Sequence, residues 1–192
     1  MADQAALVAA LDGHRPISPQ EETDVARIRA LLDRDGTDPW SRDLPMHVTA
    51  SALVLHPPTG RVLLRWHERM GSWLQVGGHA DPGEDDPVAI ALREATEETG
   101  LDDLARFPDR EADRLVHVVV VPVPAGKGEP AHEHADLRYL FTTEHPDEVV
   151  PESATASLRW LTLDAARSVV REDNLRVTLA RAGVMLQLRS EA

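Results

Sequence analysis

The sequence predicts an α/β protein, an α/β/α sandwich in which a mixed sheet is covered by helices on both faces, with extra helices at the N-terminus. Two observations lead to this fold class. Segments rich in β-branched residues alternate along the chain with segments of helical periodicity, a mixture typical of helices packed on a sheet. The 192 residues, 42% of them hydrophobic, suffice for one domain with a core and are few for two independent ones.

The N-terminal segment, residues 1–40, is predicted to form two helices and shows no chemistry of its own. Residues 2–11 are rich in alanine and leucine, and apolar residues recur at helical spacing over residues 19–35, behind a helix start at Ser18. We interpret this segment as a helical extension that packs on the main domain or mediates homodimerisation. The remaining residues, 41–192, form that domain.

The main domain combines predicted strands and helices. Strands are expected at residues 47–55, 61–66, 73–76, 115–123, 137–142 and 158–161, and helices at 86–99, 164–171 and 174–188. Residues 124–134 form a loop rich in proline, glycine and charge. Because long loops in compact domains often carry function, this loop is a candidate for substrate binding.

The composition narrows the classes of partner. The chain has no cysteine, which excludes disulfides, thiolate zinc sites and cysteine nucleophiles. Its net charge of −13 disfavours nucleic acid and anionic membranes, which bind positive surfaces. No apolar run reaches the roughly 20 residues of a membrane span, and the first residues do not resemble a signal peptide, so we expect a cytoplasmic protein. A dense acidic patch can still bind divalent cations, which would then face an anionic substrate.

One segment, residues 78–101, carries the predicted chemistry. In a helix over its second half, Glu94, Glu97 and Glu98 fall on the side opposite the apolar residues. Carboxylates at this spacing repel one another, and the helix is not stabilised by them unless cations are near. Hard oxygen ligands grouped in this way suit Mg²⁺ or Mn²⁺, which would bridge diphosphate oxygens and activate a water for in-line attack.

Arg93 lies at the edge of this acidic side. There it can pair with Glu97 one helical turn later and with Glu84 from the preceding loop, and so fix the ligands in place. One of the glutamates would act as catalytic base. The alternative interpretation is an ordinary solvated acidic face, which the preceding glycine pair, Gly77 and Gly78, and the arginine make less convincing.

These residues resemble the signature of the Nudix family, which spaces glycine, glutamate, Arg-Glu, Glu-Glu and glycine along a loop, a helix and a loop. The resemblance in strand pattern extends over about residues 45–165. It implies the Nudix fold, with Gly78 offering a backbone carbonyl to a metal and with Glu84 and Arg93 as the orienting pair. It also implies which residues are metal ligands or catalytic base: Glu94, Glu97 and Glu98.

The sequence departs from the family pattern at one place, the spacing between Glu84 and Arg93. Eight residues separate Glu84 from Arg93, one more than the family has between its first glutamate and its arginine. Either the loop bulges or Asp85 takes the role of the glutamate. From Arg93 to Leu101 the family register is kept.

Histidines form a second candidate group. The chain has nine of them; His47 opens the first predicted strand of the main domain, and His79 follows the glycine pair. Further polar residues alternate, so that an extended segment would place them on one face: His132, His134, Asp136 and Arg138. This group could bind a metal ion, and its histidines would favour Mn²⁺ or Zn²⁺ over Mg²⁺. Alternatively it could bind a phosphate, for which Arg138 is the preferred contact. Ordinary hydrogen bonding at strand edges is the alternative.

His47 and His79 are also similar in position to histidines that bind metal in the isopentenyl diphosphate isomerases, a branch with the Nudix fold. Those enzymes need a catalytic cysteine two residues before the second histidine, where this chain has Gly77. Without any cysteine, isomerisation is disfavoured, whereas a histidine-assisted metal site is not.

We therefore expect a hydrolase that cleaves the diphosphate linkage of a small-molecule nucleoside diphosphate derivative, with Mg²⁺ or Mn²⁺ as cofactor. The alternative is a Nudix-fold module that binds or regulates without catalysis; such modules usually lose the carboxylates that this chain keeps. In the family, the branch that acts on ADP-ribose often carries a proline, and the branch that acts on dinucleoside polyphosphates a tyrosine, near the positions of Val116 and His117. This chain has neither marker, so its sequence does not identify the substrate. Some aromatic residues could stack on a base or belong to the core: Trp66, Trp73, Tyr139 and Trp160.

Overall fold

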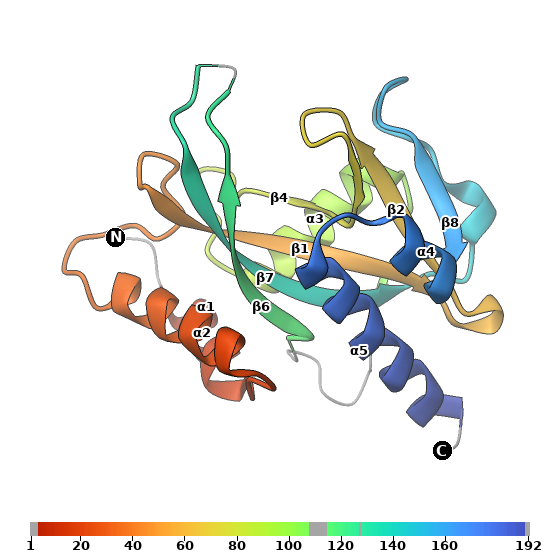
Figure 1. Ribbon diagram of the computed structural model, residues 1–192, viewed down its shortest axis with the longest axis horizontal. Helices are drawn as coiled ribbons and strands as arrows, with labels where there is room; N and C mark the ends of the chain where they lie inside the picture. Colours follow the sequence, from red (N-terminus) through yellow and green to blue (C-terminus); the bar gives the residue numbers. More distant parts are fainter. Residues whose placement is uncertain (1–3, 108–114, 127, 191–192) are drawn as a thin grey trace.

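The computed structural model describes residues 4–107, 115–126 and 128–190, and it consists of a mixed sheet with helices on both faces (Figure 1). The helices are α1 (Ala5–Gly13), α2 (Pro19–Leu32), α3 (Pro87–Thr99), α4 (Leu163–Val169) and α5 (Asp173–Ser190). The strands are β1 (Met46–His56), β2 (Arg61–His67), β3 (Ser72–Leu74), β4 (Val76–Gly78), β5 (Ala105–Arg106), β6 (His117–Val123), β7 (His132–Thr142) and β8 (Leu158–Thr162). The predicted α/β/α sandwich is confirmed. Within the described ranges, no helix is both long and apolar enough to cross a membrane.

Strand β1 organises the sheet from its centre. It pairs in parallel with β7 in one continuous register, from Met46 opposite Glu133 to Leu55 opposite Thr142. On its other side it pairs antiparallel with β2 and β4. Strands β3 and β8 extend the sheet from β2, and β5 and β6 extend it from β7. The sheet is therefore mixed, as predicted, and it brings two segments that are distant in sequence into register.

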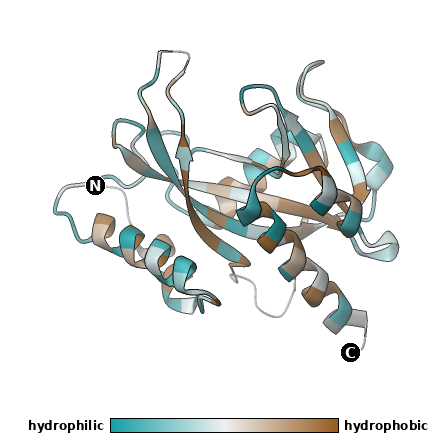
Figure 2. Ribbon diagram, in the orientation of Figure 1, coloured by the Kyte–Doolittle hydropathy of each residue, from teal (hydrophilic) through white to brown (hydrophobic). Residues whose placement is uncertain are grey.

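Side chains of β1 alternate between two hydrophobic cores, one on each face of the sheet. Val48, Ala50 and Ala52 pack in the core formed with α1, α2 and α3. Leu53 and Leu55 pack in the core formed with α4 and α5. Because successive strand residues point to opposite faces, a strand buried on both sides is apolar along most of its length. Figure 2 shows hydrophobic residues, in brown, along parts of the strands.

Helix α2 lies beside β6 and is bound to it by two carboxylates. Glu21 accepts a hydrogen bond from the backbone amide of Val118, and Asp24 accepts one from the amide of Val120, both at 3.1 Å. Apolar residues of α1 and α2 belong to the same core as those of α3. The packing interpretation of the N-terminal helices is therefore confirmed, while homodimerisation stays a prediction.

Two predicted boundaries were wrong in ways that affect the site. The strand expected at residues 73–76 is two strands, β3 and β4, which pair with different neighbours, β2 and β1. The strand expected at 137–142 begins at His132, so the end of the predicted loop 124–134 belongs to the sheet as part of β7. The pattern concealed this extension because its alternating residues are polar and border a cavity instead of a core.

Candidate active site

Helix α3 presents the acidic residues to the sheet next to β4. Asp86 caps the helix by accepting hydrogen bonds from the amides of Val88 and Ala89, at 2.9 and 3.4 Å. The helix ends at Gly100, whose φ of 70° lies in the left-handed region. One side of α3 is buried in the core: Pro87, Val88, Ile90, Ala91, Ala95 and Thr99.

Arg93 is the centre of the acidic group. Its Nε and Nη2 atoms donate to the two oxygens of Glu84, both at 2.9 Å. Its Nη1 atom donates to Glu94 and to Glu97, both at 3.0 Å. Nη2 also donates to the backbone carbonyl of His79 at 2.9 Å. The predicted pairs of Arg93 with Glu84 and Glu97 are confirmed, and one guanidinium holds three carboxylates.

The additional residue before Arg93 does not displace Glu84. The amide of Glu84 donates to the carbonyl of Asp81 at 3.0 Å, and a carboxylate oxygen of Glu84 accepts from the amide of Asp81 at 2.8 Å. This turn directs the Glu84 carboxylate to the arginine. Of the two alternatives, the loop bulges, and Glu84 instead of Asp85 pairs with Arg93. Hydrogen bonding to Arg93 lowers the pKa of Glu84 below its ordinary value.

Gly77 and Gly78 allow close packing on either side of β4. Gly77 has a φ of 143°, and a Cβ atom there would lie 2.5 Å from the Cα atom of Ser51 on β1, so this position requires glycine. A Cβ atom on Gly78 would lie 2.6 Å from the carboxyl carbon of Glu94 and would displace that side chain. The amide of Gly77 donates to Glu98 at 3.1 Å. The glycine pair is therefore next to two glutamates of α3.

The three glutamates of α3 differ in exposure. The side chain of Glu97 is 56% exposed, whereas those of Glu94 and Glu98 are 16% and 12% exposed. Burial raises the pKa of Glu98 to about 7, although Arg65 at 3.2 Å and the Gly77 amide oppose this effect. Burial also raises the pKa of Glu94. Carboxyl groups withdrawn from water in this way gain from a nearby cation.

The donor atoms of this group suit a hard divalent cation. The predicted ligands Glu94, Glu97 and Glu98 offer carboxylate oxygens, and Gly78, a residue next to Glu94, offers a backbone carbonyl oxygen. In the described residues the three carboxylates do not gather around one point, because Arg93 holds two of them. A cation would therefore have to draw at least one carboxylate away from the arginine.

The predicted histidines converge from three strands. The β1–β7 register places His47 opposite His134, and His79 follows β4 directly. The Nε2 atom of His79 lies 3.1 Å from that of His47 and 3.2 Å from that of His134. The Nε2 atom of His132 lies 3.1 Å from that of His134. Burial lowers the pKa of His79 to about 3 and that of His134 to about 4. The grouping is confirmed, and what it binds stays a prediction.

Polar residues continue from the histidines along the same face of the sheet. Asp136 accepts hydrogen bonds from Thr49 at 3.2 Å and from Ser51 at 2.6 Å, and it pairs with Arg138 at 2.8 Å. Arg138 is 4% exposed and also donates to Thr178 at 3.0 Å. The common face predicted for the alternating residues of β7 is confirmed. Arg138 is engaged inside the protein, and its contact with phosphate stays a prediction.

A cavity of about 1010 Å³ lies over this polar face. Gly77 and Gly78 of β4 border it together with all four histidines, whereas Arg93 and the glutamates that it holds do not belong to the described wall. Three further wall residues carry a buried polar atom that has no hydrogen-bond partner in the described part of the chain: Arg65 (Nε), Gln75 (Oε1) and Asn174 (Oδ1). None of the three was predicted as a site residue from the sequence. A charge within an apolar strand was the one available signal, and it pointed to Arg65 alone.

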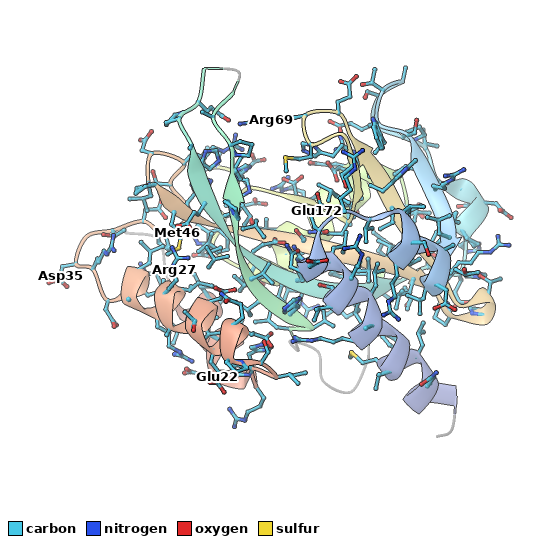
Figure 3. The ribbon with its side chains drawn as sticks, in the orientation of Figure 1. Glu22, Arg27, Asp35, Met46, Arg69 and Glu172 are labelled. Atoms are coloured by element: carbon cyan, nitrogen blue, oxygen red, sulfur yellow. The ribbon has the colours of Figure 1, made fainter. Side chains whose placement is uncertain are left out.

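The loop between β6 and β7 borders the same cavity. Arg69 extends from the β2–β3 turn toward this hairpin (Figure 3), where it donates to Glu129 at 2.9 Å and to the carbonyl of Pro124 at 2.8 Å. Glu129 lines the cavity, as expected of a substrate loop. Of the aromatic residues considered for base stacking, Trp66 lines the cavity, whereas Tyr139 is buried in the core.

Comparison with known proteins agrees with this geometry. A probable DHNTP pyrophosphohydrolase of Lactococcus lactis subsp. cremoris is 27% identical over 139 residues, which are 71% of this chain and 78% of the relative. Among solved structures, a C. elegans Ap4A hydrolase complex has a TM-score of 0.57 at 21% identity, covering 73% of this chain and 97% of that one. The E. coli dihydroneopterin triphosphate pyrophosphohydrolase has a TM-score of 0.55 at 17% identity, with coverage of 73% and 96%. These two structures show the same fold.

A closer likeness in sequence comes from a NUDIX family hydrolase of Clostridium perfringens, with a TM-score of 0.54 at 25% identity, covering 74% of this chain and 97% of that one. The family model described as the NUDIX domain matches residues 45–181, which is more than half of the chain. With the arginine-held glutamates and the glycine pair in the place of the family signature, the chain belongs to the NUDIX family of hydrolases, which act on acid anhydrides in phosphorus-containing compounds.

Proposed function

We propose that the protein is a metal-dependent hydrolase that cleaves the diphosphate linkage of a nucleoside diphosphate joined to another moiety. The observation that carries this proposal is the arginine-centred group, in which Arg93 holds three carboxylates, one of them next to Gly78, a residue that borders a large cavity. Grouped carboxylates attract cations, and cations bound between them and the cavity would face the phosphates of a substrate.

Each residue of the acidic group has a proposed role. Metal binding is assigned to the carboxylate oxygens of Glu94, Glu97 and Glu98 and to the carbonyl oxygen of Gly78. A bound Mg²⁺ or Mn²⁺ ion supplies positive charge to the diphosphate and makes a nearby water more acidic. Glu97 or Glu94 accepts the proton of the attacking water, and the exposure of Glu97 favours it for this step. Arg93 and Glu84 keep the glutamates in position.

The bond changes follow from the substrate class. The water oxygen forms a bond to one phosphorus of the diphosphate while the bond from that phosphorus to the bridging oxygen breaks. The bridging oxygen leaves with the other phosphate, so two phosphate-terminated products are released. Pairing of Glu84 with Arg93 matters for this step because a misplaced catalytic group can cost about 10²-fold in rate.

The cavity suits a substrate of nucleotide size. Its volume of about 1010 Å³ lies at the upper end of ordinary ligand pockets. Arg65 and Arg69 border it and can bind phosphate, while Trp66 offers a surface on which a base can stack. The similar proteins named above act on dihydroneopterin triphosphate and Ap4A, and both compounds therefore belong among those to be tested.

The test is a hydrolysis panel with Mg²⁺ or Mn²⁺ present. It contains nucleotide sugars, ADP-ribose, dinucleoside polyphosphates, coenzyme A, nucleoside triphosphates and dihydroneopterin triphosphate. Wild-type protein should release product from at least one compound, Glu98→Gln should lose most of that activity, and Glu22→Gln, an exposed residue of α2, should keep it. Full activity of Glu98→Gln would contradict the role of the acidic group. Binding without product release from every compound would favour a non-catalytic module.

Three further features of the protein are part of the proposal. The substrate is a small molecule, nucleic acid is not a partner, and the protein acts in the cytoplasm; the net charge of −13 supports the second of these. A homodimer is tested by light scattering of the purified protein, for which the dimer mass should be found at micromolar concentration. A monomer mass there would contradict it.

A further inference from the structure

We propose a second metal site, separate from the glutamates, in which a first-row transition metal ion such as Zn²⁺ is bound by four imidazole nitrogens, those of His47, His79, His132 and His134. This proposal is based on the positions of the four rings and does not depend on the proposed hydrolysis.

Three of the six distances between the four Nε2 atoms are close to the edge length of a coordination tetrahedron. The Nε2 atoms form a chain of contacts of 3.1, 3.2 and 3.1 Å in the order His47, His79, His134, His132. Zn–N bonds of about 2.0–2.1 Å in a tetrahedron separate the ligand nitrogens by about 3.3–3.4 Å. Ligand atoms of His47, His132 and His134 also lie within 4.8 Å of one another. Small side-chain shifts would therefore close the cluster around an ion.

The ring positions show the same arrangement. The centroid of His47 lies 5.1 Å from that of His79, 5.3 Å from that of His132 and 5.0 Å from that of His134. The centroid of His134 lies 4.8 Å from that of His79 and 5.0 Å from that of His132. Imidazoles that radiate from one tetrahedral ion at the bond length above have centroids about 5 Å apart. Five of the six pairs of rings thus have the spacing expected around one ion.

Hydrogen bonds among the rings cannot account for all three contacts. In its ring plane an Nε2 atom carries either one N–H or one lone pair, so it can join one in-plane hydrogen bond. The Nε2 atoms of His79 and His134 each have two Nε2 neighbours. At least one contact therefore brings two ring nitrogens together without a hydrogen bond. A cation among them would bind every lone pair.

Backbone carbonyls orient two of the rings with Nε2 facing the cluster. The Nδ1 atom of His47 lies 3.2 Å from the carbonyl oxygen of Leu44, and that of His132 lies 2.9 Å from the carbonyl oxygen of Pro130. Since a carbonyl only accepts, Nδ1 is the donor, and in a neutral ring Nε2 then carries the lone pair. Metal-binding histidines are typically held by such a bond from their other nitrogen.

The two metal sites would differ in the ion that they prefer. The glutamate group offers oxygen atoms, which suit Mg²⁺ or Mn²⁺, whereas four imidazoles suit Zn²⁺ and its neighbours in the first transition row. Arg93 connects the sites, because it donates to the backbone carbonyl of His79 while it holds the glutamates. Gly78, next to Glu94, and the four histidines border the same cavity.

The experiment measures bound metal directly. Protein stripped with a chelator is reloaded with Zn²⁺, passed through a desalting column and analysed by mass spectrometry for metal. About one equivalent of Zn²⁺ should remain on the wild type. The variants His79→Gln and His132→Gln should each lower the affinity for Zn²⁺ at least about 10-fold. His145→Gln, an exposed histidine outside the cluster, is the matched control and should leave it unchanged.

Co²⁺ serves as a second probe, because four-coordinate Co²⁺ bound by nitrogen absorbs visible light strongly and six-coordinate Co²⁺ bound by oxygen does so weakly. The strong bands should appear in wild type and in Glu98→Gln and be lost in His79→Gln, with circular dichroism showing that each variant is folded. Zn²⁺ binding that survives in the double variant His79→Gln/His132→Gln, or that is lost in Glu98→Gln, would overturn the proposal. If the histidines bind Zn²⁺ and no substrate is hydrolysed, only the proposed function fails.

Discussion

Removing the carboxylate of Glu21 should destabilise the fold by about 3–5 kcal/mol, the usual cost of breaking a buried ion pair. The Glu21 side chain is 0% exposed and accepts hydrogen bonds from His14 at 2.8 Å and from both terminal nitrogens of Arg181 at 2.8 and 2.7 Å. The substitution Glu21→Ala leaves the guanidinium of Arg181, 13% exposed, without this partner. The amides of Ile17 and Val118 lose an acceptor as well, which favours the upper end of the range.

The stability that Glu21 confers should depend on pH. Burial alone would raise its pKa, but hydrogen bonds from His14 and Arg181 outweigh burial and hold the pKa well below the ordinary value of 4.5. A carboxyl group with a lower pKa in the folded state stabilises that state above its unfolded pKa and stops doing so as pH falls. The difference in unfolding free energy between wild type and Glu21→Gln should therefore be largest near neutral pH and shrink below about pH 4–5.

The assay is urea denaturation followed by circular dichroism at several pH values. Glu22→Gln is the matched control, because Glu22 is the exposed neighbour on the same helix (Figure 3). The double variant Glu21→Met/Arg181→Met should recover much of the stability, since it removes both buried charges together. A loss below about 1 kcal/mol for Glu21→Ala, or a difference that grows on acidification, would refute the reasoning.

Three further predictions concern the acidic group. Gly78→Ala should lower kcat/KM about 100-fold in a folded protein, because the new Cβ atom displaces the Glu94 carboxylate; unchanged kinetics would contradict the close approach. Arg93→Lys should cost at least about 100-fold in kcat, since one ammonium cannot bind both oxygens of Glu84, and a near-normal kcat would argue against this bidentate pair. Mg²⁺ at about 100 times its Kd should add about 2.7 kcal/mol of stability to wild type, seen as a raised Tm that chelation reverses. An equal rise in Glu98→Gln would place the ion elsewhere.

Contacts between residues that are close in the sequence could be predicted in part. The pair of Arg93 and Glu97 follows from the repeat of a helix, which brings residues four apart together. The choice between Glu84 and Asp85 did not follow, because it depends on a turn closed by backbone hydrogen bonds at Asp81. Helical and strand periodicity likewise predicted most elements and missed β5, which is two residues long.

The sequence could not predict which residues from distant parts of the chain lie together in the candidate site. The alternation of His132 and His134 predicted that they share a face of a strand. Their proximity to His47 depends on the parallel register of β1 and β7, which could not be predicted from the sequence. Gln75, between β3 and β4, and Asn174, on α5, are far apart in the sequence, and no sequence pattern marks either of them. Only packing brings these residues to one cavity wall.

The two carboxylates on α2 cover the edge of the sheet at β6. Within the described residues, β6 pairs with β7 on one side, and on its other side Glu21 and Asp24 occupy the amides of Val118 and Val120. An open strand edge is a template on which a second chain can add its own strand and begin to aggregate. A shortened protein consisting of residues 41–192 would present that edge unprotected. Because helix α2 covers this strand edge, proteins shortened to residues 41–192 should precipitate where the full chain does not.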